Sequence, residues 1–285
     1  MHIAVAGIGT MGSALAERLV RHEHRVGVWN RTPGRAEALR EHGATVASSP
    51  DELADGADAV FLCLSDDAAT LDVAAPGNRP RPAWSNTVVV NTGTVSPETT
   101  SALRGHYADR FVAAPILGGP AALRSGEATL IVGGPTRARG ALDPIWSLFA
   151  GPMDAGEIPE RAAVVKLMHN HLLLAGLAVV AETVRIGRGA GVADETVAAL
   201  LRQTPLMAAG LRNRVDGLFD PEHPGWFSTP LGAKDLGLAA ALAPDESLPV
   251  TEAARAAYLL ASDAGWSDAD ISAVVEAGRP RSGRA

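Results

Sequence analysis

IAVAGIGTMG, at residues 3–12, is an apolar strand sequence that turns through three glycines into the amphipathic segment 13–21. In a βαβ unit, Gly7 permits a tight turn, Gly9 lets backbone N–H groups approach a pyrophosphate, and Gly12 lets the helix pack closely on the strand. The helix N-terminus then attracts phosphate groups. The pattern G-x-G-x-x-G also occurs in purely structural turns, but its position between a strand and a helix predicts a dinucleotide-binding Rossmann unit.

The end of the next apolar strand, residues 26–29, predicts which dinucleotide binds. Where a carboxylate would bind the ribose 2′-hydroxyl of NAD, the chain has Asn30, Arg31 and Thr32. Arg31 could stack on adenine and pair with a 2′-phosphate, and its two neighbours could donate neutral hydrogen bonds. NADP(H) is therefore the predicted cofactor. The alternative is that Arg31 is a solvated turn residue ahead of Pro33.

The composition limits the class of protein. With 285 residues, 47% of them hydrophobic and 20% charged, the chain has the composition of a soluble globular protein with room for two domains. A net charge of −7 without a basic cluster argues against a nucleic-acid partner. Cys63 is the only cysteine and has apolar neighbours, which predicts a buried strand thiol and favours a cytoplasmic location.

We expect no membrane association from this sequence. The longest uninterrupted apolar run, residues 172–181, is too short to cross a bilayer. The first residues already have a strand pattern, without the basic start and apolar stretch of a signal peptide.

Strand-like and helix-like segments alternate through the first half of the chain, which predicts a doubly wound α/β domain with parallel strands and right-handed helical crossovers. Strands are expected at residues 2–6, 25–29, 45–47, 59–64, 87–91, 111–114 and 129–132. Helices are expected to begin near residues 12, 33, 49, 67, 96, 120 and 135, with Ser49 and Ser96 as N-caps before proline and acid.

From about residue 160 onward only helical periodicity remains. Residues 160–188 predict one long linking helix, and the tail 279–285 is expected to fray. Shorter helices are expected at 193–202, 205–215, 230–243, 249–264 and 268–276. The predicted domains are a Rossmann domain at residues 1–159 and an all-α substrate and dimerisation domain at residues 160–285.

Lys166 is the candidate general acid or base. On a helix, Lys166, Asn170 and Leu173 share one face. The ammonium could protonate a carbonyl oxygen as hydride arrives, or accept the proton in the reverse direction, while Asn170 holds substrate oxygens. Periodicity alone favours the alternative, a lysine whose stem packs along an ordinary helix. His169 and His171 point to different sides of such a helix, so we expect structural roles and no shared metal site.

Two further segments carry candidate binding residues. In APILGGP, residues 114–120, Gly118 and Gly119 could present N–H groups to a substrate carboxylate, although a tight turn is the alternative. Lys234 could reach the cofactor, and Asp235 could pair with it or brace a neighbour. A surface charge pair is the alternative for these two residues.

Together these segments resemble the β-hydroxyacid dehydrogenase family, which includes 3-hydroxyisobutyrate dehydrogenases, tartronate semialdehyde reductases and glyoxylate/succinic semialdehyde reductases. The resemblance covers nearly the whole chain, and its motifs follow the family's order. They are GIGTMG at 7–12, WNRT at 29–32, CLSD at 63–66, NTGTVSP at 91–97, APILGG at 114–119 with GEATLIVGG at 126–134, KLMHN at 166–170, and Phe227 with KDLGLA at 234–239.

The resemblance implies an NADP(H)-dependent dehydrogenase or reductase acting on CH–OH or C=O groups, with a 6-phosphogluconate dehydrogenase-like C-terminal domain. It implies catalysis by Lys166 and Asn170, and substrate binding by Leu117, Gly118 and Gly119. Cofactor contacts are implied for Gly7, Ile8, Gly9, Thr10, Met11, Gly12, Asn30, Arg31, Thr32, Leu64, Ser65, Asp66, Thr94, Phe227 and Lys234. No metal is implied, and the expected assembly is a homodimer or tetramer.

The chain departs from the family pattern around the substrate. Leu117 stands where many members have a serine that binds the substrate carboxylate, and Ala113 stands at a preceding acidic position. Because leucine cannot donate a hydrogen bond, a larger or less polar carbonyl compound is the expected substrate. Imine reductases share the WNRT-type segment but have aspartate or tyrosine in place of Lys166. An imine reductase and a catalytically idle NADPH-binding protein remain the alternatives.

Overall fold

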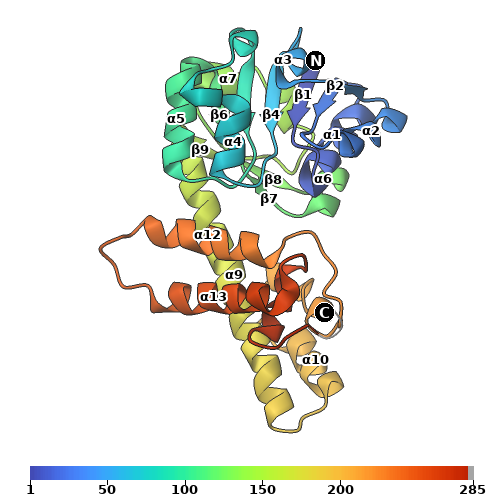
Figure 1. The fold of residues 1–285 in the computed structure, drawn as a ribbon, viewed down its shortest axis with the longest axis vertical. Helices are drawn as coiled ribbons and strands as arrows, with labels where there is room; N and C mark the ends of the chain where they lie inside the picture. The colour runs from blue at the N-terminus through green and yellow to red at the C-terminus, as the bar shows by residue number, and fades with distance from the viewer. Residues whose placement is uncertain (282–285) are drawn as a thin grey trace. The chain divides into compact units, whose positions relative to one another are not determined.

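The structure, a computed structural model, describes residues 1–281, and its contacts divide the chain into two compact units that separate between Lys166 and Leu167. The end of the predicted frayed tail, residues 282–285, lies outside the described residues. The predicted fold class is confirmed: a Rossmann-type sheet, a long helix that begins in the first unit and ends in the second, and a helical C-terminal part (Figure 1).

The first unit is built on one sheet with the strand order β3-β2-β1-β4-β5-β6-β8-β7, and β9 pairs with β8. Its strands are β1 (His2–Ala6), β2 (Arg25–Trp29), β3 (Thr45–Val46), β4 (Ala59–Leu62), β5 (Val88–Asn91), β6 (Phe111–Ala113), β7 (Ile116–Leu117), β8 (Thr129–Gly133) and β9 (Pro152–Gly156). Strands β1 to β6 pair in parallel. All seven predicted strands are present, while β7 and β9 were not predicted.

The expectation of parallel pairing throughout is wrong at β8, which runs antiparallel to β6 and β7. The cause is the short connection. Only the eleven residues 118–128 link β7 to β8, and a parallel crossover needs a dozen or more.

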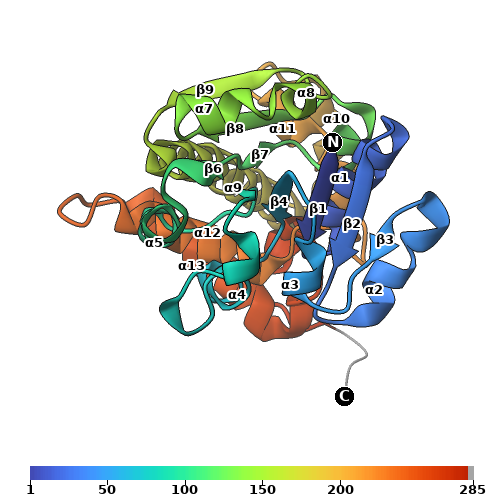
Figure 2. The same ribbon diagram turned by 90° about the horizontal axis from the view of Figure 1, so that it is seen from above.

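Helices cover both faces of the sheet, which explains the continuous apolar strands. Figure 2 shows α1 on one side of the strands and α3 and α4 on the other. The helices of this unit are α1 (Thr10–Arg21), α2 (Pro33–Glu37), α3 (Pro50–Leu53), α4 (Asp67–Ala74), α5 (Pro97–Tyr107), α6 (Pro120–Ser125), α7 (Thr136–Gly140) and α8 (Asp143–Trp146). The predicted caps are confirmed, because Ser49 Oγ accepts from Glu52 N at 3.1 Å and Ser96 Oγ accepts from Thr99 N at 3.0 Å.

The second unit contains most of α9 (Pro159–Gly189), followed by α10 (Asp194–Gln203), α11 (Ala209–Arg212), α12 (Thr229–Ala241) and α13 (Pro249–Ala261). The helix predicted at 205–215 is shorter in the structure, because only Ala209–Arg212 is helical. The residues before it form a local turn in which the Leu206 N–H donates to Thr204 Oγ1. The last predicted helix is a 3₁₀ segment, Ile271–Glu276, whose N-cap Asp270 accepts from Ser272 N.

Among the described residues, α9 is long and apolar enough to cross a membrane by length and composition. The expectation that the apolar segment is too short to cross a bilayer is therefore wrong for α9 as a whole. Isolated polar residues end the uninterrupted run 172–181, but they do not make the rest of the helix polar. One such helix is weak evidence, since the core helix of a soluble protein passes the same test.

Candidate active site

The glycine-rich turn has the geometry that a dinucleotide requires. Gly7 has φ +95°, and a Cβ on it would lie 2.5 Å from the Cys63 carbonyl oxygen. A Cβ on Gly12 would lie 1.9 Å from the Gly7 carbonyl oxygen, so a side chain is excluded where α1 packs on β1. A Cβ on Gly9 would meet no atom within 4 Å. Gly9 therefore keeps open the space at the start of α1, where phosphate groups would lie.

The N-terminus of α1 suits an anion. Its N-cap is Gly9, no side chain caps the helix, and its first turn contains no acidic residue. The first-turn N–H groups and the positive end of the helix dipole are therefore available to phosphate oxygens. The residues present fit the pyrophosphate of a dinucleotide.

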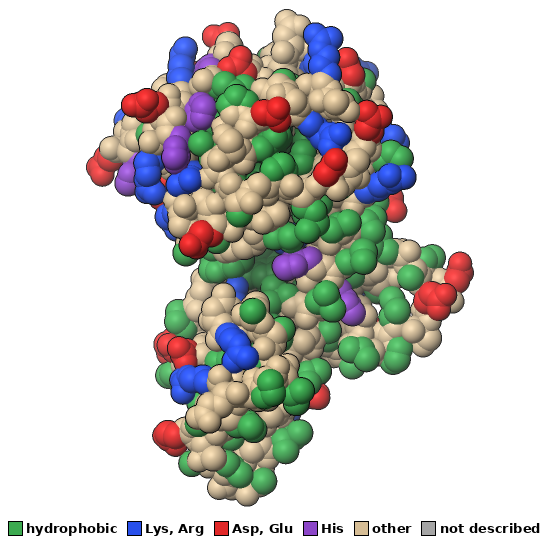
Figure 3. All heavy atoms as spheres, turned by 180° about the vertical axis from the view of Figure 1, so that it is seen from behind, with side chains coloured by type: hydrophobic (Ala, Val, Ile, Leu, Met, Phe, Trp, Pro, Cys, Tyr) green, Lys and Arg blue, Asp and Glu red, His purple; other side chains and the backbone are tan. Residues whose placement is uncertain are grey.

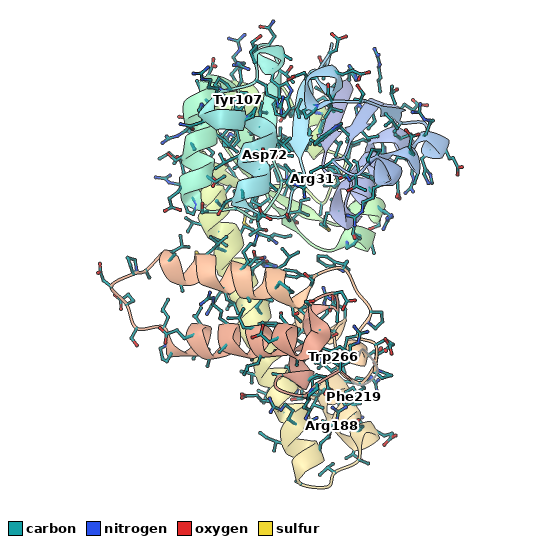
Figure 4. All side chains as sticks on the ribbon, in the orientation of Figure 1. Arg31, Asp72, Tyr107, Arg188, Phe219 and Trp266 are labelled. Carbon is teal, nitrogen blue, oxygen red and sulfur yellow. The ribbon has the colours of Figure 1, made fainter. Side chains whose placement is uncertain are left out.

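Asn30 has a local role that the sequence did not reveal. Its Oδ1 accepts from Ile8 N at 2.9 Å, and its Nδ2 donates to the Thr32 carbonyl oxygen at 2.9 Å. Asn30 thus links the glycine-rich turn to the end of β2. Its amide nitrogen, one of the donors predicted for a 2′-phosphate, already donates to the Thr32 carbonyl oxygen. Arg31 is exposed just after β2 (Figure 4) and makes no hydrogen bond or ion pair within the part of the chain that is described.

The loops after β4 and β5 reach the same edge of the sheet, because the carboxyl ends of parallel strands align there. Leu64 lies against the glycine turn, because its Cδ2 is 2.8 Å from the position that a Cβ on Gly7 would occupy. Asp66 caps α4 by accepting from Ala69 N at 2.8 Å, and Ser65 Oγ donates to it at 2.6 Å. Thr94 follows β5 in the partly buried loop before α5.

Cys63 lies directly after β4, so the prediction that it belongs to the strand is wrong by one residue. Its Sγ is 2.9 Å from Thr92 Oγ1. Burial disfavours the thiolate and raises the pKa of Cys63 to about 11. The thiol therefore stays protonated near neutral pH, as expected for a structural cysteine.

The first unit brings Lys166 to the predicted substrate segment. Lys166 Nζ donates to the carbonyl oxygen of Ile116 at 2.7 Å, and Ile116 and Leu117 form β7 directly before the two glycines. Leu117 packs, partly buried, against the apolar cluster on one face of the sheet. Gly118 is exposed with φ +129°, and a Cβ there would lie 3.2 Å from Ala122 Cβ. The amine thus lies at the segment whose N–H groups were predicted to bind substrate.

The second unit holds a buried network around Asn170, one helical turn after Lys166. Asn170 Nδ2 donates to Asp235 Oδ2 at 2.6 Å, and Lys234 Nζ lies 3.0 Å from Asp235 Oδ1. Asp235 is only 2% exposed, so the alternative of a surface charge pair is wrong. Because a carboxylate only accepts hydrogen bonds, it fixes which way the Asn170 amide points.

Other candidate residues of the second unit have structural surroundings. Phe227 is buried and stacks on Trp226 with ring centroids 5.8 Å apart. His171 Nε2 lies 3.0 Å from Thr251 Oγ1, which links α9 to α13, while His169 is exposed. Within residues 1–281, no group of three His, Cys, Asp or Glu side chains could hold a metal ion.

Both halves of the chain match known families. Residues 2–156 match the NAD-binding domain of 6-phosphogluconate dehydrogenase, and residues 161–277 match the NAD-binding domain of NADP-dependent 3-hydroxyisobutyrate dehydrogenase. The chain belongs to the β-hydroxyacid dehydrogenase family. This confirms the resemblance found in the sequence motifs.

Individual members of the β-hydroxyacid dehydrogenase family match over nearly the full length. The uncharacterized oxidoreductase YfjR of Bacillus subtilis is 30% identical, covering 97% of this chain and 99% of that protein. Mitochondrial 3-hydroxyisobutyrate dehydrogenase of Rattus norvegicus is 26% identical, covering 96% and 86%. The crystal structure of 3-hydroxyisobutyrate dehydrogenase from Salmonella typhimurium has the same fold, with a TM-score of 0.86, 23% identity and coverage of 97% and 99%.

Membership of this family establishes the class of activity. The protein is an NAD(P)-dependent oxidoreductase of the hydroxyacid dehydrogenase type, acting on CH–OH or C=O groups.

Proposed function

We propose that this member of the family is an NADPH-dependent reductase of a carbonyl compound, or the reverse dehydrogenase, with Lys166 as the general acid or base. The observation that carries the proposal is the hydrogen bond from Lys166 Nζ to the Ile116 carbonyl oxygen, which holds the amine at the Leu117-Gly118-Gly119 segment. When bound, NADPH supplies the hydride. Lysine has three N–H donors, so Lys166 can keep its bond to Ile116 and donate another proton to a substrate oxygen.

Asn170 is the proposed second contact to the substrate. Asp235 accepts one of its amide hydrogens, which leaves the second hydrogen and Oδ1 in a fixed orientation. A buried carboxylate that holds an amide in this way reduces the conformational freedom lost when substrate binds. Asp235 is thus proposed to position Asn170.

NADPH rather than NADH is proposed because Arg31 is exposed after β2 with no acidic residue beside it. Arg31→Ala should raise the KM for NADPH by roughly tenfold to a hundredfold, the effect of one charge-assisted hydrogen-bonding contact. The KM for NADH should change little, because NADH lacks the 2′-phosphate. Initial rates with both cofactors measure this, with Arg137→Ala on the exposed face of α7 as the control. Equal losses with both cofactors would contradict the assignment.

Leu117 is proposed to select a larger or less polar carbonyl substrate than the usual small hydroxy acid. Leu117→Ser should raise kcat/KM for small hydroxy acids and semialdehydes about tenfold, because the hydroxyl restores a donor to the carboxylate. The same variant should lose activity on apolar aldehydes and ketones. Steady-state rates across a substrate panel test both effects. A native enzyme with a strong preference for hydroxyisobutyrate or glyoxylate would contradict the proposal, and faster turnover of cyclic imines would indicate an imine reductase.

We also propose a cytoplasmic location. The support is that the chain has a single cysteine and so cannot form an internal disulfide, which is typical of proteins from a reducing compartment. Burial also keeps the thiol of this cysteine protonated.

A further inference from the structure

Two neighbouring loops of the first unit lie where the nicotinamide half of the cofactor is expected. Residues 63–66 follow β4, and residues 92–96 follow β5. In the sheet, β4 and β5 lie next to β1 on the side away from β2. The proposed function puts the adenosine end at Arg31 after β2 and the pyrophosphate at Gly9 after β1. The nicotinamide half then continues over the carboxyl ends of β4 and β5, so the inference below rests on the proposed function.

Surface charge does not explain how this half of the cofactor is oriented. On the face that Figure 3 shows, acidic and basic side chains of the first unit are interspersed. A field that steers a charged ligand needs one sign of charge gathered over a surface. Local contacts at the strand ends are therefore the better candidates for fixing the nicotinamide half.

Two close contacts join the loops at their starts. Cys63 Sγ lies 2.9 Å from Thr92 Oγ1. A Cβ on Gly93 would lie 2.7 Å from the Leu64 carbonyl oxygen, so the two backbones pack without room for a side chain. Thr94, for which a cofactor contact is predicted, follows Gly93 directly. The start of the loop that carries Thr94 is therefore fixed by the neighbouring loop.

The end of the Thr94 loop is held by a carboxylate from α4. Ser96 N donates to Asp67 Oδ1 at 2.8 Å. Ser96 is also the N-cap of α5, and in a capping box a Glu or Gln at the third helical position would accept from the N–H of the N-cap. The third position of α5 is Thr99. Asp67, 29 residues before Ser96, supplies the acceptor instead.

The Asp67 carboxylate is not needed to begin its own helix. Asp66 caps α4, because its Oδ1 accepts from Ala69 N at 2.8 Å. Ser96, in contrast, is buried, with 9% of its surface exposed. Without Asp67 its N–H would lose its acceptor away from water, a cost that the loop can relieve only by moving. Loss of this carboxylate should therefore displace the Thr94 loop and leave α4 in place.

We infer that Asp67 is a positioning residue for the nicotinamide half of the cofactor, because through Ser96 it holds Thr94 at the end of β5. Asp67 acts as a hydrogen-bond acceptor, since its partner is a neutral backbone N–H. An amide oxygen in the same place can accept the same hydrogen bond. The half of the cofactor that Asp67 affects is common to NADPH and NADH, whereas Arg31 is proposed to affect the half that differs.

The test compares two ligands, NADPH and 2′-phospho-ADP-ribose, which lacks the nicotinamide half. Asp67→Ala should weaken NADPH binding about tenfold, the effect of one lost hydrogen bond, and leave the Kd of the fragment unchanged. Asp67→Asn should restore native NADPH affinity, since its amide oxygen can accept from Ser96 N. The control is Asp72→Ala, which removes an exposed carboxylate from the same helix (Figure 4) and should bind both ligands as the native chain does. Isothermal titration calorimetry measures each Kd.

The outcomes separate positioning from other roles of Asp67. Retained binding of the fragment shows that Asp67→Ala is folded. Equal weakening of both ligands would indicate a structural role, and equal weakening of NADPH in Asp67→Asn and Asp67→Ala would indicate a role of the charge. Either result, or native NADPH affinity in Asp67→Ala, would overturn the inference.

Failure of the proposed function would appear elsewhere, in the native protein. It would show as absence of turnover with any carbonyl compound, or as tighter binding of NADH than of NADPH. The contrast between the two ligands in Asp67→Ala is a binding measurement, so it can be read in a protein that turns over no substrate.

Discussion

Lys166→Ala should lower kcat by about a hundredfold or more while the dissociation constant for NADPH stays nearly unchanged. The reason is that the Ile116 carbonyl oxygen holds the amine at the segment proposed to bind substrate, where it would transfer the proton that accompanies hydride. Pre-steady-state turnover with saturating NADPH and fluorescence titration of the cofactor measure the two quantities separately.

Lys166→Arg is the matched variant for this prediction. Arginine keeps the positive charge but does not give up its proton near neutral pH. It should therefore lose nearly as much kcat as Lys166→Ala, although it retains electrostatic attraction for a substrate anion. If both variants kept native turnover, Lys166 would be only a structural residue of α9. Native protein that binds NADPH tightly without turning over any carbonyl or imine would instead indicate an idle cofactor-binding protein.

The second large effect is expected at the glycine turn, where two substitutions of the same size should fail in different ways. Gly12→Ala should lower the melting temperature of the protein without cofactor by several degrees and abolish NADPH binding. Its Cβ would lie 1.9 Å from the Gly7 carbonyl oxygen, so β1 and α1 must separate. Overpacking of this kind costs about 1–3 kcal/mol or more.

Gly9→Ala is the informative partner of Gly12→Ala. Its Cβ would meet no protein atom within 4 Å, so the melting temperature without cofactor should remain native. The methyl group would occupy the space in front of the α1 N-terminus, so the stabilisation that NADPH adds to the native protein should be largely lost. Thermal melts with and without NADPH measure both effects. Gly9→Ala protein stabilised by NADPH as strongly as the native chain would contradict the placement of the pyrophosphate.

The features that the sequence predicted well are those that rest on local patterns. The continuous apolar strands, the glycine turn and the proline-acid caps each appear within a few residues, and β1, β2, α1 and α9 formed as expected. β9 escaped prediction because Pro152–Gly156 begins with proline, ends with glycine and lies largely exposed, without the run of branched apolar residues that is typical of a buried strand. The antiparallel direction of β8 depends on the length of a connection rather than on the strand sequence.

Contacts between distant residues could not be predicted. Asn170 and Asp235 are 65 positions apart, and no pattern near either one signals the hydrogen bond between them. The same holds for Ile116, whose carbonyl oxygen receives the Lys166 amine from 50 positions away. Asn30 looked like a cofactor ligand because it lies in a known motif, whereas its amide also braces Ile8. Motifs therefore identified the residues of the candidate site, and the fold defined their partners.

The most direct test of the proposed catalysis is a crystal structure of the protein with NADP⁺ and a slow hydroxy or carbonyl substrate. We expect Lys166 Nζ within about 2.6–3.2 Å of the substrate oxygen, and the reacting carbon about 3–3.5 Å from C4 of the nicotinamide. A complex in which the substrate oxygen is held by other groups, with the Lys166 amine directed to solvent, would contradict the account.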